Sequence, residues 1–201
     1  RIVGAFAMSH VLGSPVGQEE QAERVFEGMK ELGRQLRAAR PTLLVMISSD
    51  HLNNFSLDRP MPFAIGTADE YTPYGDMGLP TDPIRGDAKF STGFATYANE
   101  RGFKLHTPPG LRPDHGVMIP VGIVDPKREL PVVPLYVNTV YTPAPTPQES
   151  WRLGGLLREY ISEHCAADER VALLAGGGLS HWLGVPEEGR VNEAWDRWFI
   201  D

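Results

Sequence analysis

The sequence holds a single cysteine, Cys165, among its 201 residues. This excludes an internal disulfide and favours a reducing, cytoplasmic setting. Long apolar runs are also missing, because every run falls short of the roughly 20 residues that span a bilayer. The opening stretch RIVGAFAMSH lacks the basic region and the cleavage site of a signal peptide. We therefore expect no association with a membrane.

Basic residues are scarce: 19 Lys and Arg stand against 26 Asp and Glu, which gives a formal net charge of -7. A chain without a basic stripe is not expected to bind nucleic acid. One local arginine could still bind a small anionic substrate. The G-x-S-x-G motif is absent around Ser180, so a serine nucleophile of the hydrolase type is not predicted.

Strands rich in Val, Ile and Leu alternate with helical patterns along the chain. We predict buried strands at Ile2–Met8, 42–48, 62–66, 131–138 and 170–176, and a short extended segment at 103–107. We predict helices at 19–40, 87–101, 148–164 and within 192–201. This alternation favours an α/β fold: one domain over 1–201, with a mostly buried central sheet flanked by helices.

Some details of these elements can also be predicted. Two prolines in 131–138 favour an edge or an end of the sheet for that strand. Asp87 is expected to cap its helix at the N-terminus. The apolar side of the helix at 148–164 is expected to carry Trp151, Leu156, Tyr160 and Ile161.

Four of the six histidines share one context, the end of a predicted strand or a loop beside it. They are His10 in MSH, His51 in SDH, His115 in RPDHG and His181 in GGLSH. Ligands bind beyond the carboxyl ends of the strands in α/β sheets, so we expect these four side chains to share a pocket there. The strands before His10 and His51 are expected to be neighbours. The other two histidines, His106 and His164, receive no function.

Imidazole suits both metal binding and proton transfer. Neutral imidazole binds Fe, Zn, Cu and Ni, and a site of two histidines and one carboxylate leaves coordination positions open. Histidine is also an acid and a base near neutral pH. Two ligands and two proton carriers are the natural division, but spacing leaves open which histidine does which. Asp50, beside His51, could orient an imidazole or cap the strand end.

The ordered motifs MSH, SDHLNNF, RPDHGVMIP and GGGLSHW together resemble the class III extradiol ring-cleaving dioxygenases, and the similarity runs over the whole chain. That group includes the protocatechuate 4,5-dioxygenase β-subunit and 2,3-dihydroxyphenylpropionate dioxygenase. The resemblance implies opening of a catechol-type ring with O₂ and non-haem Fe(II), in the degradation of aromatic compounds. It makes His10 and His51 the iron ligands, His181 the acid/base, and His115 the second catalytic histidine.

The resemblance also implies a glutamate as third ligand, on a C-terminal segment that we expect to lie beyond residue 201. Glu193 is the nearest candidate by position but does not match that motif, and it suits the first turn of a helix. The family implies a small aromatic diol as substrate and a homo-oligomer, with a small companion subunit left open.

Two other functions stay open. The chain could be a non-catalytic member of the fold that acts as a binding module. It could also be a zinc-dependent hydrolase, because histidine suits Zn²⁺ equally. Arg112, Asn53 and Asn54 could contact a substrate, although a structural role is favoured for each. Trp182 could pack beside an aromatic ring or close its loop against the core.

Overall fold

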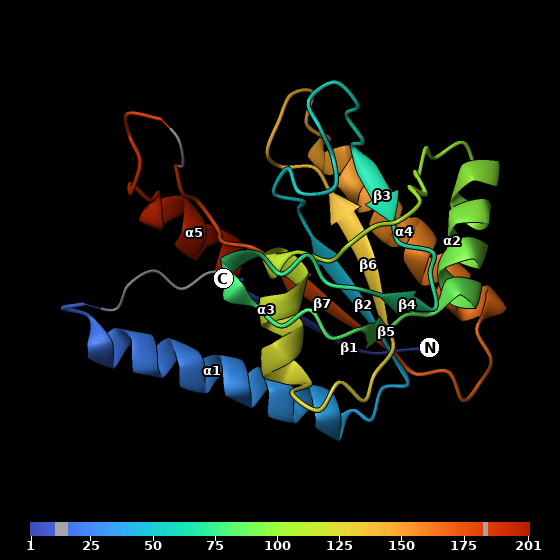
Figure 1. Cartoon of the computed structure of the whole chain (residues 1–201), viewed down its shortest axis with the longest axis horizontal. Helices are drawn as coiled ribbons and strands as arrows, with labels where there is room; N and C mark the ends of the chain where they lie inside the picture. Colours follow the sequence, from blue (N-terminus) through green and yellow to red (C-terminus); the bar gives the residue numbers. More distant parts are fainter. Residues whose placement is uncertain (11–15, 183–184) are drawn as a thin grey trace.

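A five-stranded sheet forms the centre of the computed structural model, which describes residues 1–10, 16–182 and 185–201. In spatial order its strands are β1 (Ile2–Met8), β7 (Val171–Gly176), β2 (Leu43–Ser48), β6 (Val132–Val137) and β3 (Phe63–Ile65) (Figure 1). The first four are parallel, and β3 runs antiparallel to β6. The predicted α/β fold is confirmed.

Helices cover both faces of the sheet. They are α1 (Glu19–Ala38) and α3 (His115–Val124) on one face, and α2 (Ala88–Glu100) and α4 (Pro147–His164) on the other (Figure 1). Side chains along β2 alternate between the two cores, as the pleat of a strand requires. Leu44 and Met46 pack with α1 and α3, whereas Leu43 and Val45 pack with α2 and α4. Both faces of the sheet are thus buried, which explains its almost continuous apolar strands.

The parallel strands end level with one another. Met8 of β1 lies opposite Gly176 of β7, and Ile47 of β2 lies opposite Ala175. The loops that follow β1, β2 and β7 therefore start at the same edge of the sheet. However, β7 lies between β1 and β2, so the expectation that the strands before His10 and His51 are neighbours was wrong. The last strand along the chain fills the gap between the first two.

The strand β6 is interior, between β2 and β3, although its prolines predicted an edge or an end. Pro134 lies opposite Met46 of β2, and its carbonyl accepts a hydrogen bond from Gly66 N on the other side. The N–H and C=O of one residue point to the same side of a strand, so the missing N–H of Pro134 concerns only the pairing with β3. The β3 ladder stops at Ile65, and the proline costs little there.

Two helices differ from the sequence predictions. Trp151 of α4 is 86% exposed, so its predicted place on the apolar side was wrong. Leu156 and Ile161 are buried as predicted, together with Leu153 and Leu157. The helix α3 was not predicted, and His115 is its first residue rather than part of a loop. This helix is apolar on nearly every side and contains Pro120, so it shows no helical periodicity.

Smaller elements complete the described chain. They are the paired strands β4 (Glu70–Tyr71) and β5 (Ile84–Arg85), the short 3-10 helix η1 (Asp76–Gly78) and the helix α5 (Glu193–Ile200). The predicted cap of α2 is confirmed, because the Asp87 side chain accepts a hydrogen bond from Phe90 N. Within the described ranges, every helix is too short or too polar to cross a membrane.

Candidate metal centre

Three of the four predicted histidines lie together at the carboxyl edge of the sheet. His10 follows β1, His51 follows β2, and His115 begins α3. The ring centroids are 4.8 Å apart for His10 and His51, 5.5 Å for His10 and His115, and 4.1 Å for His51 and His115. One nitrogen of each ring lies within 4.8 Å of those of the other two. Three imidazole donors at this spacing can hold one metal ion.

The ring of His10 has a nitrogen available to coordinate a metal ion. Its Nδ1 atom is buried and has no hydrogen-bond partner among the described residues. Burial, and next the positive charges of protonated His51 and His115, lower its pKa from 6.5 to about 4. The ring is therefore neutral at physiological pH, which is the form that coordinates a metal. An orphaned, buried, neutral nitrogen beside two other imidazoles fits a transition metal.

His51 is held by Asp114, a carboxylate that the sequence analysis missed. Asp114 Oδ2 lies 3.0 Å from Nδ1 of His51 and 3.1 Å from its backbone N, and the Asp114 side chain is completely buried. Burial alone would lower the pKa of His51, but the hydrogen bond and the negative charge of Asp114 outweigh it and the pKa is raised. Burial likewise favours a higher pKa for Asp114, and the hydrogen bonds from His51 outweigh it, so that the pKa is lowered.

Asp114 also begins the helix that carries His115. Its Oδ1 atom accepts a hydrogen bond from Gly116 N at 3.1 Å, as the N-cap of α3. One buried carboxylate thus fixes the ring of His51 and the start of α3 together. The signal in the sequence was the aspartate directly before His115 in RPDHG, where a helix cap is common.

His115 is held by a second carboxylate, that of Asp76 in η1. The Oδ2 atom of Asp76 lies 2.5 Å from Nδ1 of His115, and its Oδ1 atom accepts from the backbone N of His115 at 3.0 Å. Asn53 lies between the two carboxylates and donates to Oδ2 of Asp76 and to Oδ2 of Asp114, at 3.2 Å each. Asp76 carried no signal in the sequence, because its loop is 39 residues away from His115.

His181 does not join the group of three. Its side chain is exposed, and its Nδ1 lies 2.9 Å from the backbone oxygen of Leu179. Its charge still contributes to the lowered pKa of His10, behind burial and the other two histidines. The neighbouring Ser180 is bound twice to Asp196 of α5, through its N at 2.8 Å and its Oγ at 2.9 Å. The structure therefore places His181 on a loop anchored to α5, outside the three-histidine group.

Asp50 caps the loop and does not orient an imidazole. Its carboxylate accepts from the backbone N of Asn54 and of Phe55, and from Nδ2 of Asn54. Of the two roles predicted for Asp50, orienting an imidazole or capping the strand end, the structure shows the cap. Directly after His51, Leu52 has a φ of 61°, a left-handed conformation that turns the chain sharply. Capping and turn together present the ring of His51 at the sheet edge.

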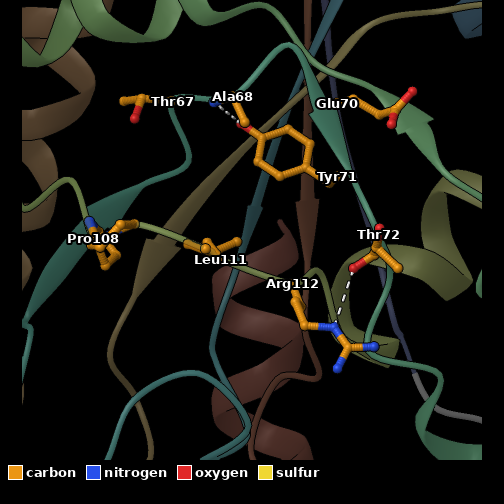
Figure 2. A pocket seen from close by; sticks show the side chains of 10 residues that line it. Thr67, Ala68, Glu70, Tyr71, Thr72, Pro108, Leu111 and Arg112 are labelled. Carbon is orange, nitrogen blue, oxygen red and sulfur yellow. Dashed lines mark hydrogen bonds between the residues drawn. The ribbon is translucent and has the colours of Figure 1, made fainter.

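Arg112 and Asn54 also have structural partners. Asn54 exchanges two hydrogen bonds with the backbone of Arg112, and the guanidinium of Arg112 donates to the carbonyls of Pro73 at 3.0 Å and Tyr74 at 3.3 Å. Figure 2 shows this side chain turned to the carbonyl of Thr72, at the end of a cavity of about 450 Å³. Arg112 thus joins loops through its Nε and Nη2 atoms. Trp182 is 38% exposed.

Comparison with known proteins agrees with this geometry. Residues 4–201 match the family described as the catalytic LigB subunit of aromatic ring-opening dioxygenase. The chain belongs to this LigB family. Its predicted resemblance to class III extradiol dioxygenases is confirmed, with His10, His51, His115 and His181 all inside the matched residues.

Several curated relatives of this LigB chain are named 2,3-dihydroxyphenylpropionate/2,3-dihydroxicinnamic acid 1,2-dioxygenase. That of Mycolicibacterium smegmatis is 30% identical over 182 residues, which cover 89% of this chain and 56% of the relative. That of Escherichia coli (strain K12 / DH10B) is also 30% identical, over 88% of this chain and 56% of the relative. That of Photorhabdus laumondii is 25% identical and covers 88% and 54%. The chain spans about half the length of these relatives.

A solved structure shares the LigB fold seen here. The crystal structure of uncharacterized protein JW3007 from Escherichia coli K12 aligns with a TM-score of 0.51 at 18% identity. The alignment covers 79% of this chain and 54% of that one. This likeness supports the fold alone.

Proposed function

We propose that this protein opens the ring of a catechol-type aromatic compound by extradiol dioxygenation, with O₂ and non-haem Fe(II), in aromatic compound degradation. The convergence of His10, His51 and His115 carries the proposal. Imidazole nitrogens suit iron, and the LigB family is described by aromatic ring opening. When bound, Fe(II) would hold the diol and O₂ side by side and let electrons pass between them.

His10 and His51 are the metal ligands in this proposal. The buried Nδ1 atom of His10 can coordinate the metal, because it has no hydrogen-bond partner in the described chain. The ring of His51 is oriented by Asp114, the kind of outer carboxylate partner that ligating histidines have in metalloproteins. Two imidazoles leave room for a further ligand and for substrate.

His115 and His181 are the catalytic proton carriers. With its Nδ1 turned to Asp76, His115 has Nε2 left to exchange a proton with a substrate hydroxyl. His181, whose side chain is exposed, acts from the loop anchored to α5. Proton transfer by positioned side chains of this kind contributes about 10²–10⁴-fold to a rate.

The substrate proposed is a small aromatic diol. Arg112 is not offered as its anchor, because its guanidinium joins loops by donating to the carbonyls of Pro73 and Tyr74. We also propose a single catalytic domain over 1–201, a cytoplasmic setting and a homo-oligomer with or without a small companion subunit. Co-purification and light scattering of the natural protein test the assembly.

Oxygen uptake tests the proposed reaction. The protein, loaded anaerobically with Fe(II), is mixed with a panel of catechols in air while O₂ and the yellow ring-opened product are followed together. Uptake of one O₂ for each ring opened supports the proposal. Hydrolysis of an ester or amide by the Zn²⁺-loaded protein, without O₂ uptake, would point to the zinc hydrolase instead. Catechol binding without turnover would point to a binding module.

A further inference from the structure

The carboxylate of Asp76 contacts His115 through both of its oxygen atoms. Its Oδ1 atom accepts from the backbone N at 3.0 Å, and its Oδ2 atom lies 2.5 Å from Nδ1 of the ring. The side chains of Asp76 and His115 are 18% and 13% exposed, so little water competes for these contacts. Hydrogen bonds to both the backbone and the ring fix the position and the orientation of the imidazole.

We propose that Asp76 is the positioning residue of His115: it holds the ring in the tautomer that carries its proton on Nδ1 and leaves Nε2 as the free acceptor. This inference rests on the proposed function, in which His115 exchanges a proton with the substrate. Ionised carboxylate oxygens only accept hydrogen bonds, so a ring nitrogen that faces one must be the protonated nitrogen. The other nitrogen is then the base.

The backbone around Asp76 is shaped for this contact. Gly75, Met77 and Gly78 all have positive φ angles, of 83°, 54° and 74°. A side chain at Gly75 would meet Thr81, since an added Cβ would lie 2.6 Å from its Cγ2 atom. Met77 adopts the left-handed conformation without being glycine, which is uncommon and costs free energy. Backbone strain of this kind clusters at functional sites.

Asn53 ties this contact to the proposed metal ligand. Its amide has two N–H donors, one directed to each carboxylate, and both distances are 3.2 Å. A continuous path of hydrogen bonds therefore runs from His51 through Asp114, Asn53 and Asp76 to His115. The path sets the two rings in one arrangement, with 4.1 Å between their centroids.

The network needs a carboxylate at position 76 rather than an amide. Oδ2 accepts from both Asn53 and His115, while Oδ1 accepts from the backbone of His115. In Asp76→Asn one of these atoms becomes an NH₂ group, which donates. If the NH₂ group replaces Oδ2, it faces Nδ1, and the ring would have to move its proton to Nε2. If it replaces Oδ1, it faces the backbone N–H of His115, which is also a donor.

Nuclear magnetic resonance of the metal-free protein tests the tautomer directly. Two-bond ¹H–¹⁵N correlations distinguish protonated from unprotonated ring nitrogens, and the His115 signals are identified by their loss in His115→Gln. We expect the Nδ1–H form in the wild type, and a mixture or the Nε2–H form in Asp76→Asn. Asp87→Asn, a change of a helix cap away from the site, is the matched control and should resemble the wild type. An unchanged His115 tautomer in Asp76→Asn would overturn the proposal.

Steady-state kinetics supply the second arm. Asp76→Asn should keep its iron and its KM, and lose about 10²-fold or more in kcat, the range of acid–base help. An altered tautomer with a wild-type kcat in an active enzyme would overturn the positioning role. If the wild type opens no ring, the proposed function fails, while the tautomer experiment still decides whether Asp76 sets the ring.

A second variant guards against misfolding of the first. Asp76→Glu keeps the charge and both acceptors but lengthens the side chain by one methylene, and it should preserve the Nδ1–H tautomer. A displacement of about 1 Å costs up to about 10²-fold in rate, so kcat should fall with iron content unchanged. A wild-type kcat in Asp76→Glu with a shifted tautomer would contradict the proposal.

Discussion

The buried carboxylate of Asp114 joins two elements of the site, because Oδ2 lies 3.0 Å from Nδ1 of His51 while Oδ1 caps α3 at Gly116 N. His51, a metal ligand in the proposed function, is thereby tied to the helix that carries the next imidazole, that of His115. The pair is the structural centre of the account.

Asp114→Ala should cost both stability and metal affinity. The loss of the cap costs about 1 kcal/mol, and the buried donors left without an acceptor add about 1–3 kcal/mol. We therefore expect the free energy of unfolding to fall by about 2–4 kcal/mol in chemical denaturation. Metal affinity should fall about 10–100-fold, as expected when an outer partner of a ligating histidine is lost.

Asp87→Ala is the matched control for this variant, because Asp87 also caps a helix but has no histidine partner in the described chain. It should cost about 1 kcal/mol and leave metal affinity unchanged. Equal effects of the two substitutions on metal affinity would contradict the role given to Asp114.

His10 makes the stability of the metal-free protein depend on pH in the acid range. Its pKa is about 4 in the fold against 6.5 in the unfolded chain. Between these values the unfolded state binds more protons, so the stability of the fold falls as the pH drops from about 6.5 to about 4. His51 acts in the opposite sense: its pKa is raised by Asp114, so its contribution is present below 6.5 and is lost as the pH rises through the folded value.

Substitution of His10 separates the two histidines. His10→Asn removes a group that titrates in the acid window, so its free energy of unfolding should fall less steeply than that of the wild type from pH 6.5 to 4. Denaturation curves of the metal-free proteins at several pH values supply the comparison. Parallel curves for the two proteins would mean that His10 does not titrate as described.

The anchor of the His181 loop can be tested through Asp196. Asp196→Ala removes the acceptor of Ser180 N and Oγ. Among the hydrogen bonds of the described residues, the loop is then held to α5 only by the one from Asn192 N, the N-cap residue, to Ser180 Oγ, and so more loosely. We expect kcat to fall by up to about 10²-fold through misplacement of His181, with iron content unchanged.

Glu193→Gln offers a control on the same helix, because its ion pair with Arg197 is exposed and such pairs contribute little. Its activity should equal that of the wild type. Loss of activity in both variants would assign the effect to α5 as a whole rather than to the anchor.

Much of the fold follows from local patterns in the sequence. The strand Ile2–Met8 was predicted with its observed bounds, and α1 was predicted two residues too long at its end. Apolar runs and helical spacing are local properties, which explains this success. Strand order is not local: nothing in the sequence requires β7 to lie between β1 and β2. The helix α3 was missed because it is buried on nearly every side.

The site was predictable only in its imidazoles. Four histidines at strand ends or beside them were expected to converge, and three of them, His10, His51 and His115, do. His181 lies outside their group, since its loop is directed by Asp196 of α5. The supporting carboxylate of Asp76 reaches His115 from a separate loop, and such a contact exists only after the chain has folded.

The iron content of four single variants tests the central claim most directly. Each variant is made in the full-length protein, loaded anaerobically with Fe(II), freed of excess metal and analysed for iron per chain. The account predicts that His10→Ala and His51→Ala lose their iron, whereas His115→Ala and His181→Ala keep it and turn over slowly. Stoichiometric iron and a normal rate in His10→Ala would contradict it.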